Sequence, residues 1–365
     1  MSGMITNDLS RNEKNVLYHL VAYPDLPDKD ISEMTSLGVS TVTKIRNFLF
    51  KEDYLRTIIV PHVQRIGAEL MGLGYGEINP DISMDQKLEV GREISRELTG
   101  TFLTLGDGNQ AVGWGFHPNF TACIKNILYT KRVFGKEAIL STGEMHSIMA
   151  SFEIAKIYRF FNYAPLIANE FGIDDPDYKE EDDYLSPGDQ VRLSKKEKLV
   201  LYGLVRFPDF NDKKLSSYLN ISRQTISAVK KRFQKNNYIS RRNIPNIGKL
   251  GFEVVVFAHV QLKNDVSVNQ DEMKEGLRED HVIQSFCHGT DIVSLSVFPD
   301  FASTKVKVSD FLKDTKARVL FAAEPTIYLF SARDLIYQLD HAYHVPLKTL
   351  LRIDTNDISM EDPIT

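Results

Sequence analysis

The sequence predicts an α+β fold with two winged helix-turn-helix modules, each followed by a ferredoxin-like (split βαβ) α/β sandwich domain. Three observations predict it. The chain of 365 residues contains a long internal repeat, each copy opens with the signature of a helix start, and apolar strand segments alternate with amphipathic helices afterwards. A helical module that precedes a mixed strand and helix region in each copy is typical of an α+β arrangement.

The internal repeat is long and free of gaps. Residues 9–67 match residues 193–251 at a constant offset of 184, and 19 of these 59 pairs are identical. The similarity continues at an offset of 181 as far as Pro165 and Leu166, which match Pro346 and Leu347. Agreement at this level over two stretches indicates that the chain consists of two copies of one repeated unit.

The repeat predicts where the domains begin and end. We expect winged helix-turn-helix modules at residues 1–67 and 193–251, and ferredoxin-like domains at residues 68–173 and 252–365, the second with a C-terminal helix. Residues 174–192 contain a block of Asp, Glu and Pro with almost no aliphatic side chain. Such a composition cannot bury enough apolar surface to fold and predicts a solvated acidic linker.

Each helical module begins with Ser-x-x-Glu, at Ser10 and Glu13 and again at Ser194 and Glu197, which is the capping box of a helix start. Two further helices follow, and the third has apolar residues spaced three and four apart. Those residues are Val42, Ile45 and Leu49 in the first copy and Ile226, Val229 and Phe233 in the second. One face of the third helix is therefore expected in a tri-helical core. Extended segments at 54–60 and 238–244 are predicted to be wing strands.

The remainder of each copy has the order strand, helix, strand, strand, helix, strand, which is the order of a split βαβ sandwich. We predict these elements at 68–76, 85–97, 101–105, 111–116, 120–134 and 138–149 in the first copy, and at 253–262, 271–278, 283–287, 292–298, 303–313 and 319–330 in the second.

The free face of the third helix carries short polar and cationic side chains that can contact base edges and phosphates. A helix of this kind fits the major groove of DNA, which is about 12 Å wide. The predicted DNA-binding residues of the first copy are Ser40, Thr43, Lys44, Asn47, Lys51 and Arg56. Those of the second copy are Arg223, Gln224, Ser227, Lys230, Lys231, Lys235, Arg241 and Arg242.

Charge separates the two copies. The formal net charge of −5 argues against a protein that coats nucleic acid over its whole surface, but it permits a local basic face. Residues 222–249 hold eight basic side chains and no acidic one, whereas residues 38–65 hold five basic and two acidic side chains. We therefore expect the second module to make most of the phosphate contacts.

Few residues offer other chemistry, and we predict no catalytic residue, metal site or cofactor. Cys123 and Cys287 are too few for a disulfide framework or a four-thiolate zinc site. His341 and His344 have a metal-compatible spacing but lack further ligands nearby, so we expect a surface or packing role. The single Trp114 is predicted to be core. No export signal and no apolar run of 18 residues occurs, which predicts a cytoplasmic protein that is not in the membrane.

The second copy resembles the leucine-responsive, feast/famine (Lrp/AsnC) regulators. The residues that carry the resemblance are the segment Pro245-Asn-Ile-Gly-Lys-Leu-Gly-Phe252, which leads into a strand, and Gly289-Thr-Asp-Ile-Val293 at the turn between the middle strands. The first copy has Arg65-Ile-Gly67 at the matching entry, but Gly108-Asn-Gln-Ala-Val112 at the turn lacks the acidic residue usual in the family.

What the resemblance implies is a transcriptional regulator that binds double-stranded DNA and is not an enzyme. Its two sandwich domains would form within one chain the pair that such regulators usually make from two chains. A small-molecule effector in a cleft between the sandwich domains is implied by the resemblance alone, and association of two chains into a homodimer stays open.

Two alternatives also stay open. The sirohaem decarboxylases resemble feast/famine regulators in fold, and they need basic and His side chains to hold a polycarboxylate tetrapyrrole. Here the middle strands 111–116 and 292–297 carry apolar or small residues, and no cluster of His and Arg is apparent in either copy. In the other alternative, the first module binds a protein and only the second reads DNA.

Overall fold

The computed structural model describes residues 9–141, 144–180, 190–265, 270–313 and 320–353, which divide into two compact units. Unit 1 takes its described residues from 1–56, 154–184 and 242–335, and unit 2 takes its own from 57–153, 185–241 and 336–365. Each unit therefore combines the helical module of one copy with the sandwich of the other. The linear domain boundaries stay a prediction, and residues 181–189 of the expected linker lie outside the described residues.

Both helical modules have three helices, as expected. Unit 1 contains α1 (Arg11–Ala22), α2 (Asp28–Thr35) and α3 (Val39–Lys51), and unit 2 contains α7 (Lys195–Arg206), α8 (Asp212–Leu219) and α9 (Arg223–Lys235). The capping boxes at Ser10 and Ser194 are present, which confirms the predicted helix starts. The apolar faces predicted for α3 and α9 are buried.

The two segments predicted as wings are strands, β1 (Leu55–Pro61) and β7 (Ile239–Pro245), and they pair with each other into a two-stranded sheet. Each segment finds its partner in the other copy of the repeat. A short 3-10 helix, η1 (Val63–Ile66), follows β1.

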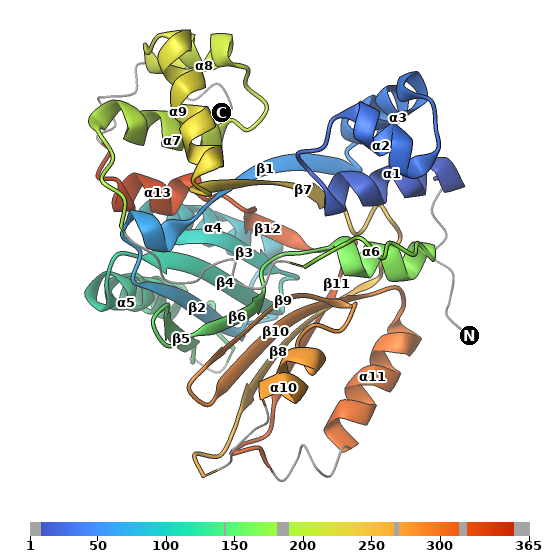
Figure 1. Cartoon of the computed structure of the whole chain (residues 1–365). Helices are drawn as coiled ribbons and strands as arrows, with labels where there is room; N and C mark the ends of the chain where they lie inside the picture. The colour runs from blue at the N-terminus through green and yellow to red at the C-terminus, as the bar shows by residue number, and fades with distance from the viewer. Residues whose placement is uncertain (1–8, 142–143, 181–189, 266–269, 314–319, 354–365) are drawn as a thin grey trace. The chain divides into compact units, whose positions relative to one another are not determined.

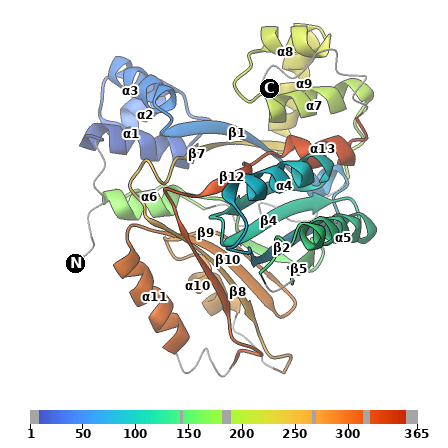
Figure 2. The same cartoon turned by 180° about the vertical axis from the view of Figure 1, so that it is seen from behind.

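The sandwich of unit 2 confirms the predicted element order. It contains β2 (Leu70–Glu77), α4 (Met84–Glu97), β3 (Thr101–Gly106), β4 (Gln110–His117), α5 (Phe120–Lys136) and β5 (His146–Ser151). The sheet order is β12-β3-β4-β2-β5, and its last four strands have the order of a ferredoxin-like fold. Helices α4 and α5 lie on one face of this sheet (Figure 2).

The sandwich of unit 1 has the same order of elements: β8 (Val254–Gln261), α10 (Gln270–Gly276), β9 (Val282–His288), β10 (Asp291–Phe298), α11 (Phe301–Lys313) and β11 (Thr326–Ser331). Its sheet order is β11-β8-β10-β9-β6. Both sandwiches therefore have the ferredoxin-like α+β arrangement that the sequence predicts.

The fifth strand of each sheet comes from the other copy, as the colours of Figure 1 show. Strand β6 (Lys156–Arg159) of the first copy joins β9, and strand β12 (Ile336–Leu339) of the second copy joins β3. Helix α6 (Ala164–Phe171) follows β6 and packs against α1, and α13 (His344–Leu350) follows β12 and packs against α7. The two copies thus exchange a strand and a helix.

The C-terminal helix α13 begins at His344, so His341, whose spacing to His344 suggested a shared helix, lies outside it with a φ of 51° in the left-handed region. The two histidines therefore do not share a helix face. Among the described residues, no helix is both long enough and apolar enough to cross a bilayer.

Candidate functional site

Helix α9 of unit 2 exposes a cationic face. The Ser222 hydroxyl accepts a hydrogen bond from the Thr225 backbone N–H at 3.2 Å and so caps the helix. Because Ile226, Val229 and Phe233 are buried, the cations lie on the solvent side. Arg223, Lys231 and Lys235 are exposed, and we call these three residues the α9 cationic face.

The other DNA-binding residues predicted for the second copy lie in different environments. Gln224 is exposed on α9, whereas Ser227 and Lys230 are half-buried there. Arg241 is half-buried on β7 and donates a hydrogen bond to the Thr57 hydroxyl at 3.3 Å. Arg242 is half-buried and belongs to unit 1, where its charge lies near Tyr178. Arg232, which was not among the predicted residues, forms an ion pair with Glu197.

Helix α3 of unit 1 is less cationic. Its residues Ser40, Lys44, Asn47 and Lys51 are exposed, as a DNA-binding face requires, and Arg56 is exposed on the following strand β1. Thr43 is held by Asp28, since its hydroxyl donates to that carboxylate at 2.5 Å.

The first copy also places apolar side chains where the second has arginines. Val39 and Phe48 are 46% and 37% exposed, and by the repeat they occupy the positions of Arg223 and Arg232. The N-cap of α3 is Gly38, which supplies no side-chain hydrogen bond.

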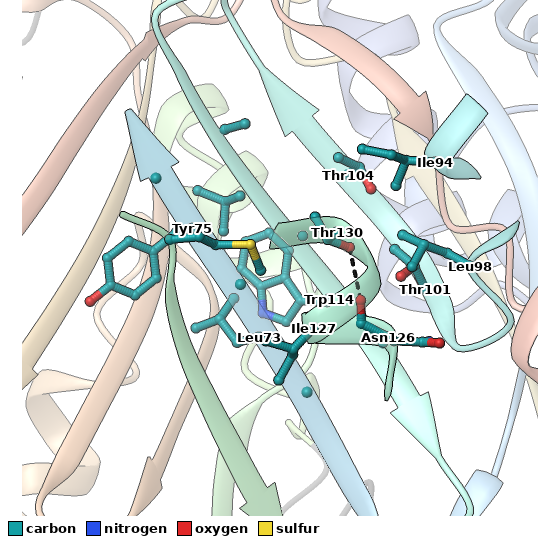
Figure 3. Close-up of a pocket in the computed structure, with 18 of the residues that line it drawn as sticks. Leu73, Tyr75, Ile94, Leu98, Thr101, Thr104, Trp114, Asn126, Ile127 and Thr130 are labelled. Carbon is teal, nitrogen blue, oxygen red and sulfur yellow. Dashed lines mark hydrogen bonds between the residues drawn. The ribbon is translucent and has the colours of Figure 1, made fainter. Parts of the chain in front are cut away.

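A pocket of about 120 Å³ lies in the sandwich of unit 2, between the sheet and helices α4 and α5 (Figure 3). The sheet residues beneath it are glycines on alternate positions of two paired strands. Gly72 and Gly74 of β2 pair with Gly115 and Gly113 of β4, and Gly76 pairs with Ala111. We call the five glycines the glycine floor. Alternate residues of a strand share one face, so this strip of the sheet face carries no side chains of its own, and side chains such as those of His117, Cys123 and Met145 reach over it.

The matching strip of unit 1 is filled. Val256, Ala258 and Val260 of β8 occupy the positions of the three β2 glycines, and they pair with Ser296, Ser294 and Ile292 of β10. The sequence shows the glycines as Gly-x-Gly-x-Gly and Gly-Trp-Gly, but only the pairing of β2 with β4 reveals that they make one surface. A period of two in both segments is the signal that could have predicted the pocket.

Polar groups gather at one end of the glycine floor. His117 is 5% exposed, and burial lowers its pKa to about 4, so its ring is neutral at pH 7. Burial also raises the pKa of Cys123 to about 12, which keeps the sulfur as a thiol. Because the thiolate is the reactive form, this environment does not favour Cys123 as a nucleophile activated by His117. Within the described ranges, no three His, Cys, Asp or Glu side chains are placed to hold a metal ion.

No family model matches the sequence, and no curated protein matches it. Among solved structures, the chain is similar to sirohaem decarboxylase NirDL, with a TM-score of 0.48 and 11% identity over 94% of this chain and 99% of that one. NirDL in complex with an iron-uroporphyrin III analogue gives a TM-score of 0.48 and 10% identity over 93% and 99%. The structure of an anthrone oxidase-like protein gives 0.34 and 10% over 75% and 96%.

The comparison with NirDL corrects one expectation. NirDL is an enzyme, and it is similar to this chain over almost its whole length. Our prediction that the chain is not an enzyme is therefore corrected: the fold also occurs in a decarboxylase, so the fold gives no ground for excluding an enzyme. At 10–11% identity the likeness concerns the fold alone, and whether this chain is a regulator stays a prediction.

Proposed function

We propose that this protein is a transcriptional regulator that binds double-stranded DNA chiefly through helix α9 of unit 2. The observation that carries the proposal is the α9 cationic face. Arg223, Lys231 and Lys235 are exposed on one capped helix, and residues 222–249 contain no acidic side chain to neutralise them. Exposed cations on a helix that fits the major groove are what phosphate binding requires.

The α9 face also carries groups suited to base recognition. Gln224 is exposed beside Arg223 near the helix N-terminus, the part of a recognition helix that contacts base edges. An amide side chain can donate to and accept from adenine, whereas Lys231 and Lys235 supply charge to the phosphates on either side. The face therefore combines base reading with backbone attraction.

Helix α3 of unit 1 has a secondary role in this proposal. Lys44 and Asn47 are exposed, but Val39 and Phe48 replace arginines and make part of the surface apolar. An exposed apolar surface on this module is compatible with a protein partner in place of DNA. The experiment below separates these two roles.

Titration of labelled genomic duplex fragments, followed by fluorescence anisotropy, tests the proposal. Replacing Gln224 by Ala together with Lys231 by Gln should weaken binding at least tenfold, because one base contact alone contributes about 1–3 kcal/mol. The matched pair in unit 1 is Lys44→Gln with Asn47→Ala. A smaller loss in that pair supports α9 as the main reader, and no loss supports a protein-binding role for the first module. Unchanged binding in the α9 pair would refute the proposal.

A sirohaem-decarboxylase-like enzyme is the second candidate. The observation in its favour is the apolar pocket beside the glycine floor, which could take one edge of a flat ring system but not a whole tetrapyrrole. The lining of the pocket counts against it, because no Lys or Arg side chain is present to hold the carboxylates of a tetrapyrrole. An absorbance spectrum after incubation with a sirohaem-type tetrapyrrole, with assay for released carbon dioxide, distinguishes the candidates. A bound chromophore and carbon dioxide release would favour the enzyme.

A further inference from the structure

The pocket of unit 2 plays no part in the proposed DNA binding, and it is built from described residues of one unit. We propose that it binds an uncharged, planar heteroaromatic molecule of one or two rings. The inference does not depend on the proposed function. It places a ligand site inside one sandwich domain, between its sheet and its helices.

The glycine floor argues for a planar ligand. At Gly113 a flat molecule can approach the peptide groups of β4. Over Gly72, Gly74 and Gly115, groups of His117, Cys123, Met145 and Gly100 lie within 3.0 Å of an added Cβ, so the flexible end of Met145 must move before a ligand can extend along the floor. A Cβ atom added at Gly113 would meet nothing closer than 3.6 Å, which is ordinary van der Waals contact, so a small group fits above this residue without displacing a neighbour. The corresponding strip of unit 1 is occupied by side chains, so the opening is specific to one copy.

The charge of the lining argues for a neutral ligand. None of the residues that line the pocket is Asp, Glu, Lys or Arg. An ionised carboxylate or phosphate that entered would lose its hydration without gaining an opposite charge, which is strongly unfavourable. The apolar wall, formed by residues such as Ile94, Leu98, Ile127 and Met145, favours a ring system instead.

Two buried polar groups argue for ring heteroatoms. The Asn126 Nδ2 atom is buried and has no hydrogen-bond acceptor among the described residues. His117 lies beside the floor, since Cβ atoms added at Gly72 and Gly115 would come within 3.0 and 2.9 Å of its Nε2 atom. A neutral imidazole offers one donor and one acceptor. A ring nitrogen that accepts from Asn126 would satisfy a group that is otherwise costly to bury.

The size of the pocket limits the ligand. Its volume of about 120 Å³ is close to that of an engineered protein cavity of about 150 Å³ that takes up benzene. One ring fits such a space, and a second ring can extend toward the open side. A tetrapyrrole is much larger than this pocket.

Calorimetric titration of the full chain with benzimidazole, at a pH well above the pKa of His117, tests the inference. Benzimidazole is planar, has one acceptor and one donor nitrogen, and should bind saturably. Benzimidazole-5-carboxylate should bind at least about tenfold more weakly, because its charge finds no partner. Asn126→Ala should weaken benzimidazole roughly tenfold through the lost hydrogen bond.

Variants at two glycines provide the control. Gly113→Val fills the floor and should abolish benzimidazole binding, whereas Gly135→Ala on α5, where an added Cβ meets nothing within 4 Å, should leave it unchanged. If Gly113→Val does not fold, Gly113→Ala replaces it, since its Cβ makes only ordinary contacts. Equal binding in a folded Gly113 variant and in the wild type, tighter binding of the carboxylate, or no saturable binding of benzimidazole would overturn the inference. The DNA-binding pair at Gln224 and Lys231 should retain benzimidazole, so the two proposals fail separately.

Discussion

At the scale of single residues, small differences between the two copies decide what each module can do. Ser222 caps α9, while Gly38 leaves α3 without a side-chain cap. His117 of unit 2 lies by the pocket, while Phe298, its equivalent in unit 1, packs in an apolar cluster. These exchanges retain the fold and change the chemistry of one copy.

The N-cap of α9 gives a stability prediction. Ser222→Ala should lower the free energy of unfolding by about 1 kcal/mol, because the hydroxyl accepts a backbone N–H that would otherwise have no partner within the helix. Ser222→Gly should cost only a few tenths of a kcal/mol. Urea unfolding followed by circular dichroism measures both, and equal stability of wild type and Ser222→Ala would contradict the assigned cap.

Burial of His117 gives a pH prediction. Its pKa falls from 6.5 in the unfolded chain to about 4 in the folded protein, so between these values the unfolded state binds more protons. The free energy of unfolding should therefore not depend on His117 above about pH 6.5. Below that pH it should fall by up to about 1.4 kcal/mol per pH unit toward pH 4. His281 of unit 1, whose pKa burial also lowers to about 4, titrates over the same range.

The neutral variant His117→Gln isolates the share of His117. Urea unfolding of wild type and variant across this range should show a shallower loss in the variant. An equal loss of unfolding free energy with falling pH in wild type and variant would contradict a buried, neutral His117.

At the scale of elements, the exchanged strands explain how each sheet is completed. Strand β6 ends at Arg159, which is 4% exposed and forms a two-point ion pair with Glu180 at 2.6 and 2.7 Å. Its guanidinium also donates to the carbonyls of Arg278 and Glu279, both at 2.8 Å. All of these groups lie in unit 1, so Arg159 fixes the exchanged strand within it.

Arg159→Gln should destabilise unit 1 by about 3–5 kcal/mol, because it leaves buried carbonyls and a carboxylate without their cation. Lys156→Gln on the same strand is the control, since Lys156 is exposed and a surface substitution usually changes stability by less than about 0.5 kcal/mol. Thermal unfolding measures both. A similar small effect of the two substitutions would show that Arg159 does not hold β6.

The sequence predicts local elements better than their partners. The capping boxes and the apolar spacing of α9 depend on residues three or four apart, so the helix starts and the exposed face are confirmed by the structure. The four-residue strands β6 and β12 have no such pattern, and their partners lie in the other copy. The glycine floor was missed for the same reason, because it exists only where β2 and β4 pair.

At the scale of the whole molecule, duplication has given two copies of one fold with different surfaces and interiors. Unit 2 combines the more cationic helix α9 with the pocket, whereas the matching sheet strip of unit 1 carries side chains and its helix α3 is less cationic. Helix α13 packs on α7 and on strands β3 and β4, so unit 2 links its helical module to the sheet that carries the pocket. In this account the two units have divided their roles.

The salt dependence of DNA binding tests the central claim most directly. Each phosphate contact adds about 0.9 to the slope of the logarithm of affinity against the logarithm of salt concentration. The double variant Lys231→Gln with Lys235→Gln should therefore have a slope shallower than that of the wild type by about 1.8, and Lys44→Gln with Lys51→Gln should change it less. Equal slopes in the α9 variant and the wild type, or a larger change in the α3 variant, would contradict α9 as the principal contact with DNA.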